Sequence, residues 1–255
     1  LTSMYGRQDN RMQETLDITR SQKPQSLNQE FKLYFTLADD HIFSFEAQHL
    51  DQEENPFSRA IRDRNPFTRL IPFSSSVNKY DVTQERLVQT AKLEAKLDYY
   101  YLLNDTSNIN LSLGVTDVKQ DFDSSFFQIL DNGSLLNFND PTFNNDVNFD
   151  FSDAYIALNY RLRTGIFTID PGLTLHYYKT KNTQLGTSFE RNISDVRPNL
   201  RINLQFKKSE SLRLTFRKNT QFTDINNLAE GFVFNNYNSI FPVSYTHLRA
   251  HETGY

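Results

Sequence analysis

Two histidines four residues apart lie near the end of the sequence, in the string VSYTHLRAHET from Val243 to Thr253. On a helix, His247 and His251 would share one face with Glu252 nearby, and a metal site can use that spacing. Such a site also needs an element that holds the pair and supplies further ligands. The 255 residues include no cysteine, so neither a thiolate cluster nor a disulfide framework is available.

Other residues with catalytic or metal-ligating side chains lack partner residues at a useful spacing. His41, His49 and His176 have no cysteine, no serine in a nucleophile-elbow motif and no carboxylate at a spacing typical of an active site. The loop expected over 117–153 contains DNGS and NDPTFNND, but it lacks the ordered ligand spacing of a calcium loop. We therefore predict no catalytic residue, no cofactor and no metal site.

Composition excludes several classes of protein. The net charge of −4 argues against a nucleic-acid partner, because such domains are strongly basic. No apolar run reaches the length of about 18 residues that a transmembrane helix needs. The chain begins at Leu1 without a charged and then apolar leader, so we expect either no signal peptide or a true beginning outside this sequence.

Apolar and polar residues alternate with a period of two along most of the chain. From Arg86 to Leu103 the odd positions are almost all apolar or aromatic and the even positions are mostly polar or charged. Successive side chains of a β-strand point to opposite faces, so the pattern predicts a strand with one apolar and one polar face. The same alternation predicts strands at 31–37, 43–47, 108–116, 153–163, 167–177, 196–206 and 212–216, with a weaker one at 12–19.

The two predicted faces also differ in charge. In the strands after Arg86 the apolar face carries no charged residue, and only Gln89 on it is plainly polar. A lysine or arginine facing lipid at mid-bilayer costs about 2–4 kcal/mol, so a lipid-facing surface must exclude charge in this way. A soluble β-sandwich also buries one face of each sheet, so this pattern alone leaves that fold open.

Connection lengths separate the two folds. Short turns are expected at 38–40, 104–107, 164–165 and 207–211, and long connections at 51–84, 117–152, 179–195 and from 219 onward. This parity is typical of outer-membrane barrels, and loops beyond about 15 residues are uncommon in compact soluble domains. We predict an all-β fold, a partial antiparallel transmembrane β-barrel of about 8–9 strands with short periplasmic turns and long extracellular loops. Within it, Pro171 and Pro198 should lie at bulges or edges.

Three collinear segments carry a resemblance to a known family. They read YIALNYRLRTGIFTIDPGLTLHYYKTK, NISDVRPNLRINLQF and LRLTFRKNTQFTDINNLAEGFVFNNYNSIFP. They resemble the barrel domain of TonB-dependent receptors, in particular the outer-membrane β-barrel family that usually carries a carboxypeptidase-regulatory-like domain at its N-terminus. The resemblance covers most of Leu27 to Pro242 and is uninformative about substrate.

The resemblance implies a location, a mechanism and partners. It implies a 22-strand barrel in the outer membrane of a Gram-negative bacterium, of which this chain would supply roughly a third. The implied partners are outer-membrane lipid, a plug domain of the same chain and the TonB energy-transducing complex, reached through an N-terminal part that this sequence does not contain.

The histidine pair acquires a different interpretation in this context. In the family, a segment like NNYNSIF leads into a further strand, whereas here the chain passes into VSYTHLRAHET, which resembles the translation of a sequencing adapter. We expect residues 1–242 to be a partial outer-membrane β-barrel domain and 243–255 to be a non-native tail. A natural polar tail and the metal site are the alternatives.

Two sets of residues are candidates for binding. The polar face carries more cations than acids, and a cationic wall could guide an anionic solute or hold an acidic plug, unless charges elsewhere neutralise it. These cations are Arg86, Lys92, Lys96, Arg161, Arg163, Arg197, Arg201, Arg213 and Arg217. In the first long connection, the near-repeats NPFSR and NPFTR present Phe57, Arg59, Phe67 and Arg69, which could contact a ligand, lipopolysaccharide or a surface lipoprotein.

Three classes of function follow. The leading hypothesis is an energy-coupled outer-membrane transporter of an unidentified solute. The first alternative is a barrel that acts as a passive adhesion or assembly scaffold, which a plug with an N-terminal coupling motif would exclude. The second is a soluble all-β binding module, and an enzyme is the least supported class.

Overall fold

The computed structural model of the chain describes residues 3–5, 12–65, 71–138, 143–184, 186–220, 232–236 and 239–242. Eleven strands form one antiparallel sheet with the order β13-β12-β11-β10-β8-β7-β5-β4, in which β6 joins β3 to β7 and β9 pairs with β8. The bounds are β3 Leu16–Ser21, β4 Gln25–Ala38, β5 His41–Glu54, β6 Phe57–Arg62, β7 Tyr80–Asn104, β8 Ser107–Ile129, β9 Leu135–Asn137, β10 Asn144–Thr164, β11 Phe167–Gln184, β12 Thr187–Lys207 and β13 Glu210–Arg217.

Four short strands pair outside this sheet. β1 (Ser3–Tyr5) pairs with β2 (Met12–Glu14), and β14 (Phe232–Asn236) pairs with β15 (Ser239–Pro242). In the described part of the chain, no helix is long and apolar enough to cross a membrane.

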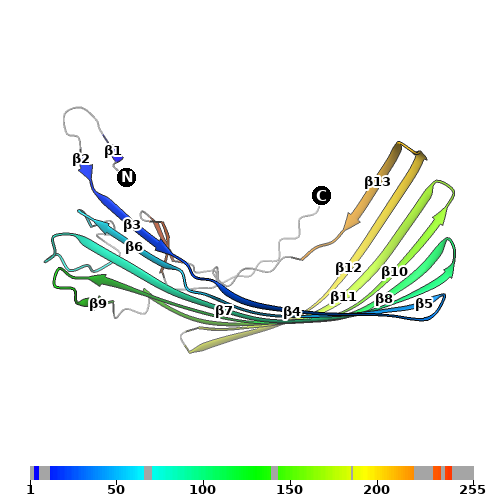
Figure 1. The fold of residues 1–255 in the computed structure, drawn as a ribbon, viewed down its shortest axis with the longest axis horizontal. Helices are drawn as coiled ribbons and strands as arrows, with labels where there is room; N and C mark the ends of the chain where they lie inside the picture. The colour runs from blue at the N-terminus through cyan, green and yellow to red at the C-terminus, as the bar shows by residue number, and fades with distance from the viewer. Residues whose placement is uncertain are drawn as a thin grey trace.

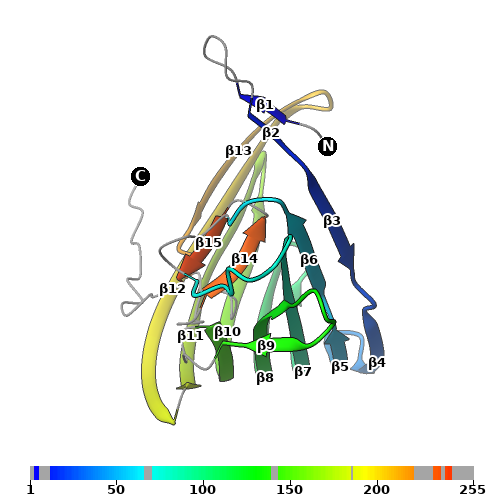
Figure 2. The ribbon, with the colours of Figure 1, turned by 90° about the vertical axis from the view of Figure 1, so that its left-hand side faces the viewer.

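The large sheet bends into a trough that does not close (Figure 1). Its path ends at β13 on one side and at β4 on the other, and Figure 2 shows the strands side by side along the trough. The all-β antiparallel fold is therefore confirmed, and the curved open sheet has the form of a partial barrel.

Tight turns join the strands at one end of the sheet, as predicted. They lie at Asp39-Asp40, Asp105-Thr106, Gly165-Ile166 and Lys208-Ser209. Gly165 adopts a φ of +54°, a left-handed conformation that side chains with a Cβ rarely take. These four turns set the register of the hairpins that they close.

The strands extend further than predicted at the opposite end. The long connection predicted over 179–195 is wrong, because β11 continues to Gln184 and β12 starts at Thr187 after a tight turn in which Gly186 has a φ of +78°. In the first connection, Phe57 and Arg59 lie on β6 rather than in a loop. Around Gly186, polar residues occupy both faces, so no apolar alternation indicated a strand there. The connection predicted over 117–152 is also too long, because β8 continues to Ile129 and β10 starts at Asn144.

Several predicted residues fall outside the part that the structure describes. Phe67 and Arg69 of NPFTR are among them, as is the tail 243–255 with His247 and His251. The predictions about NPFTR, the metal site and the tail stay predictions.

The two strand prolines lie where the ladder is weak. Between β10 and β11 the pairing passes from Asn159–Gly172 to Leu162–Ile169, which leaves Pro171 unpaired on that side. Pro198 lies just beyond the last β12–β13 pair, Asn199–Arg217, and its carbonyl accepts a hydrogen bond from Lys218 N at 3.4 Å. A proline cannot donate to the ladder, so both positions avoid the loss of a hydrogen bond.

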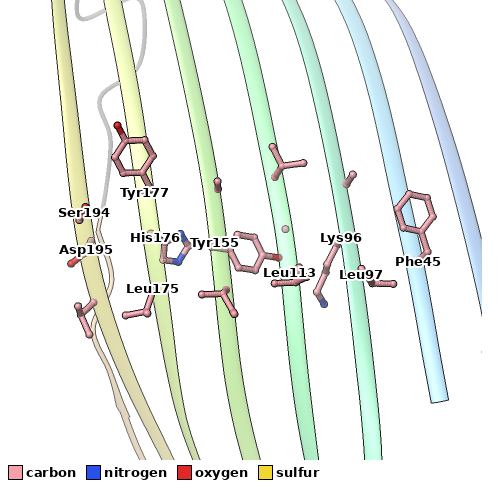
Figure 3. Close-up of a pocket in the computed structure, with 16 residues that line it drawn as sticks. Phe45, Lys96, Leu97, Leu113, Tyr155, Leu175, His176, Tyr177, Ser194 and Asp195 are labelled. Atoms are coloured by element: carbon pink, nitrogen blue, oxygen red, sulfur yellow. The ribbon is translucent and has the colours of Figure 1, made fainter. Parts of the chain in front are cut away.

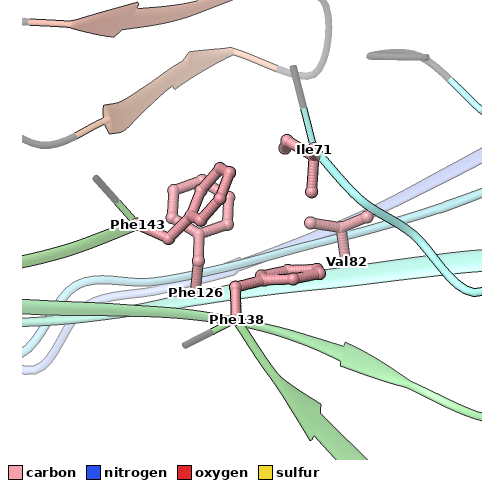
Figure 4. Packing of buried hydrophobic residues seen from close by; sticks show 5 residues of the cluster. All are labelled: Ile71, Val82, Phe126, Phe138 and Phe143. Carbon is pink, nitrogen blue, oxygen red and sulfur yellow. The ribbon is translucent and has the colours of Figure 1, made fainter. Parts of the chain in front are cut away.

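A small apolar core lies beside the start of β7 and the end of β8, at the end of the sheet that is remote from the short turns. It consists of Ile71, Val82, Phe126, Phe138 and Phe143 (Figure 4). The neighbouring connections are tied down by polar contacts: Ser74 N donates to Gln128 Oε1 at 2.8 Å, and Asn78 Nδ2 donates to Asp131 Oδ2 at 2.7 Å. Together these contacts fix residues 71–79 and 130–138 over one face of the sheet.

The apolar core yields a stability prediction. Phe126→Ala removes a ring that is 1% exposed and should lower the free energy of unfolding of this region by about 3–5 kcal/mol. We expect faster hydrogen exchange and proteolysis at 71–79 and 130–138. Leu135→Ala is the control, since Leu135 is 59% exposed, and equal exchange in the two variants would contradict the packing described.

Candidate functional site

One face of the sheet is apolar and uncovered. A continuous cross-strand row of paired residues crosses the middle of that face, formed by Leu33, Phe45, Leu97, Leu113, Ile156, Leu175 and Val196. From Leu97 to Val196 these side chains are between 41% and 51% exposed. We use the name belt for one part of this face. It consists of the apolar-face residues of the eight strands from β4 to β13 that lie between the short turns and the cross-strand row containing Asp117.

A shallow groove of about 740 Å³ crosses the middle of the sheet (Figure 3). Leu97, Leu113 and Leu175 follow one another along it, each on a different strand. Small residues, Ala95 and Ala154, lie one row further from the short turns and leave the groove open. The groove is part of the belt and lacks a convergent set of polar side chains.

Polar residues bound the belt at a constant height. Two cross-strand rows further from the short turns than the leucines, the paired residues are His49, Leu93, Asp117, Ser152, Lys179 and Asn192, all of them polar except Leu93. On β8 the apolar stretch therefore spans residues 107–116, about 33 Å along a strand at about 3.4 Å per residue. Tilted by about 40°, it would measure about 25 Å, the height of the apolar band in outer-membrane barrels.

The opposite face, the inner wall, carries all nine cations predicted for it. The alternation places them on the face that contains Val82 and Phe126 and that is covered by residues 71–79. Four of them have a carboxylate partner: Lys92–Glu94 at 2.8 Å, Lys96–Asp98 at 2.7 Å, Arg161–Asp170 at 2.7 Å and Arg197–Asp195 at 2.9 Å. The predicted excess of positive charge is therefore partly neutralised within the wall itself.

The remaining five cations differ in their surroundings. Arg213 donates from Nε to Asn203 Oδ1 at 2.9 Å. Arg163, Arg201 and Arg217 have no side-chain partner among the described residues. Arg86 lies on the side of the belt remote from the short turns, and its buried Nε has no hydrogen-bond partner among the described residues.

Aromatic rings and ions form a cluster at the centre of the inner wall. His176 Nδ1 lies 2.9 Å from Asp153 Oδ1, and its ring stacks on Tyr178 with centroids 5.1 Å apart. The Arg197 guanidinium lies 5.3 Å from the Tyr178 ring centroid, a cation–π arrangement. His176, for which the sequence indicated no carboxylate partner, is thus held between a carboxylate and an aromatic ring.

Asp195 organises the edge of this cluster. It accepts hydrogen bonds from Arg197 Nε at 2.9 Å, Lys218 Nζ at 2.7 Å and Thr220 Oγ1 at 2.6 Å. The chain leaves β13 at Arg217, so these contacts draw residues 218–220 against the inner wall. Sequence reasoning missed Asp195 because it began the strand at Val196, although continued alternation places Asp195 beside Arg197.

A glycine lets one aromatic ring lie flat on the wall. A Cβ at Gly114 would collide with the ring of Tyr155, which crosses the neighbouring strand at that point. The Tyr155 ring also contacts His176, with centroids 5.2 Å apart. Gly114 therefore provides the space in which the central cluster packs.

On the side of the belt remote from the short turns, the pKa values of several charged groups are shifted by their surroundings. Burial raises the pKa of Asp123, and the neighbouring carboxylates Asp146 and Asp121 raise it further. Burial lowers the pKa of Arg86, and Arg20 adds to that effect. The hydrogen bond that Arg59 donates to Asp81 raises the pKa of Arg59, whose Nε lies 2.8 Å from Asp81 Oδ1. Arg59 is therefore engaged within the sheet.

The described residues contain no group of three His, Cys, Asp or Glu side chains that could hold a metal ion. The convergent polar groups on the inner wall are cations, amides and aromatic rings. Such groups can bind or guide a solute through hydrogen bonds and charge, and no nucleophile with an adjacent base is found among those described above.

Fold and faces together define a curved antiparallel sheet of the barrel type. Solved structures with a similar fold include the ferric citrate transporter FecA, at 12% identity over 80% of this chain and 38% of that chain with a TM-score of 0.44. Others are the copper transporter OprC (12%, 84% and 43%, TM-score 0.37) and the siderophore receptor PiuA from Acinetobacter baumannii (9%, 82% and 48%, TM-score 0.34).

This chain spans 38–48% of the length of those three proteins. No family model matches the sequence. No curated protein matches it either. At these identities and TM-scores the likeness concerns the fold class and carries no argument about function.

The three bonds to Asp195 yield a prediction. Asp195→Ala leaves Arg197 and Lys218 without their carboxylate and should cost about 2–4 kcal/mol locally. We expect residues 218–220 to exchange amide hydrogens at least tenfold faster. Glu210→Ala serves as the control, because its pair with Lys207 is exposed and surface pairs contribute about 0–1 kcal/mol. Unchanged exchange in Asp195→Ala would show that Asp195 does not anchor the segment.

Proposed function

We propose that the chain forms part of the barrel of a TonB-dependent outer-membrane receptor, which takes up an unidentified solute by energy-coupled transport. The observation that supports this most strongly is the belt, an uncovered apolar surface that crosses eight strands and ends at a polar row. A water-soluble monomer rarely exposes so large an apolar patch. The resemblance of three sequence segments to this receptor family supplies the coupling mechanism.

A bilayer accounts for both faces of the sheet at once. Lipid would cover the exposed leucines of the belt, while the inner wall would face an aqueous lumen in which its ion pairs stay hydrated. The open edges at β4 and β13 would pair with further strands, because unpaired backbone groups are not tolerated in hydrocarbon. The short turns would then lie at the periplasmic side.

The proposed partners follow from this placement. Outer-membrane lipid would contact the belt, a plug domain of the same protein would occupy the lumen, and the TonB complex would act on that plug. On the extracellular side, Phe57 and Arg59 lie on β6, where they could contact a ligand or a surface lipoprotein. The cations of the inner wall would guide an anionic solute or hold an acidic plug.

A pair of lysine substitutions tests the membrane assignment. Leu113→Lys places a charge in the middle of the belt and should cost about 2–4 kcal/mol, seen as reduced folded protein in the outer-membrane fraction. Thr116→Lys is the matched control on the same strand, since it enters the inner wall between Glu94 and Asp153.

The two lysine variants discriminate between the functional classes. Normal accumulation of Thr116→Lys together with loss of Leu113→Lys is the expected result, whereas equal accumulation would exclude a lipid-facing belt. Solute uptake that collapses when the proton gradient is dissipated would distinguish the transporter from a passive scaffold. A scaffold would stay in the membrane and show no such dependence.

A further inference from the structure

A basin of about 480 Å³ opens on the inner wall near the short turns. Two adjacent cross-strand rows provide its polar lining. One row contains Asn110, Asn159 and Asn199, and the other contains Arg161 and Arg201. Arg217 pairs with Asn199 and completes the basin at the edge of β13.

Side-chain amides form a chain across the floor of this basin. Asn199 Nδ2 donates to Asn159 Oδ1 at 3.5 Å, and Asn159 Nδ2 donates to Asn110 Oδ1 at 3.4 Å. The first bond passes over Gly172, where an added Cβ would collide with Asn159 and would lie 2.5 Å from Asn199 Nδ2. The glycine therefore allows the two amides to approach one another across β11.

The chain of amides ends in a donor without an acceptor. Asn110 Oδ1 accepts from Asn159 and lies 3.2 Å from Ser112 Oγ, which donates its hydrogen to Asp98, whereas Asn110 Nδ2 is buried and has no hydrogen-bond partner among the described residues. A buried donor without a partner costs about 1–3 kcal/mol.

The charge of the basin is positive. Arg161 donates from Nε to Asp170 Oδ1 at 2.7 Å, so these two side chains offset each other. Neither Arg201 nor Arg217 has a side-chain partner in the described part of the chain, although both line the basin. Two arginines without a side-chain partner among the described residues thus line a space large enough for a small molecule.

We infer that this basin binds a small solute that carries at least two acidic oxygens, such as a phosphate or a dicarboxylate. Guanidinium groups present paired N–H donors that match the geometry of such oxygens. The inference rests on the proposed function, because it places the solute in the lumen of the barrel. It adds the chemical class of the solute and a binding site close to the periplasmic end.

Asn110→Asp tests the inference with minimal change in shape. The new carboxylate keeps the oxygen that accepts from Asn159, and it places a negative charge beside the basin that repels an anion. Equilibrium dialysis of radiolabelled inorganic phosphate against the full-length protein in detergent micelles measures the effect. We expect saturable binding by the wild-type protein, competition by succinate, and at least a tenfold loss of affinity in Asn110→Asp.

Variants that each remove one positive charge provide the control. Arg201→Gln and Arg217→Gln should each weaken phosphate binding at least fivefold, whereas Lys32→Gln, which removes the same charge from the same face outside the basin, should leave it unchanged. Equal losses in all three would show that general charge, and not the basin, attracts the anion. They would overturn the inference.

Two further outcomes separate this inference from the membrane assignment. A wild-type protein that folds in the outer membrane but binds no phosphate would overturn the basin while leaving the barrel intact. If an acidic segment of the same protein occupies the basin, Arg217→Cys labelled with a thiol-reactive photo-cross-linker would cross-link to that segment, phosphate would not compete, and the free-solute site would be wrong. Failure of the lysine test described above would instead remove the lumen itself.

Discussion

Backbone pairing across eight long strands is the constraint on which the rest of this structure depends. The antiparallel register runs with few interruptions from β4 to β13, so that every second residue points to the same side across the whole sheet. A slip of one residue in any strand would move its leucines into the inner wall and its charges onto the belt. The tight turns at one end and the exceptional positions of Pro171 and Pro198 both serve to keep that register.

The register explains how one sheet carries two different surfaces. Leu97, Leu113 and Ile156 stand on one side, while their sequence neighbours Lys96, Ser112 and Tyr155 stand on the other. On the inner wall the alternation brings Asp195 and Arg197 to the same side of β12, and cross-strand proximity brings Asn159 to Asn199. Glycines at 114 and 172 then allow large or polar side chains to close over the sheet where a Cβ would block them. Packing and electrostatics are therefore consequences of the pairing.

The alternation of residues was enough to predict the belt, the short turns and the side on which each cation lies. It failed where both faces are polar, as in the extension of β11 and β12 around Gly186, because no apolar signal marks a strand there. It also could not show which cations are neutralised. Glu94, Asp98 and Asp195 each pair with a cation two residues away on the same strand, and Asp195 lies in an unpredicted extension. Asp170 pairs with Arg161 across two strands, which depends on their register. The amide chain through Asn110 requires the register of four strands, which the sequence alone does not supply.

The central claim is that the belt faces lipid and the inner wall faces water. The 255 residues contain no tryptophan, so a single tryptophan introduced among them reports its own surroundings once any tryptophan elsewhere in the full-length protein has been replaced by phenylalanine. The most direct measurement is quenching of that fluorescence by brominated phospholipids in reconstituted protein, with tryptophan placed in turn at 97, 113 and 175 and at 92, 116 and 174. Strong quenching at the first three positions and weak quenching at the last three would support the account. Equal quenching of both sets, or protection of the first set, would contradict it.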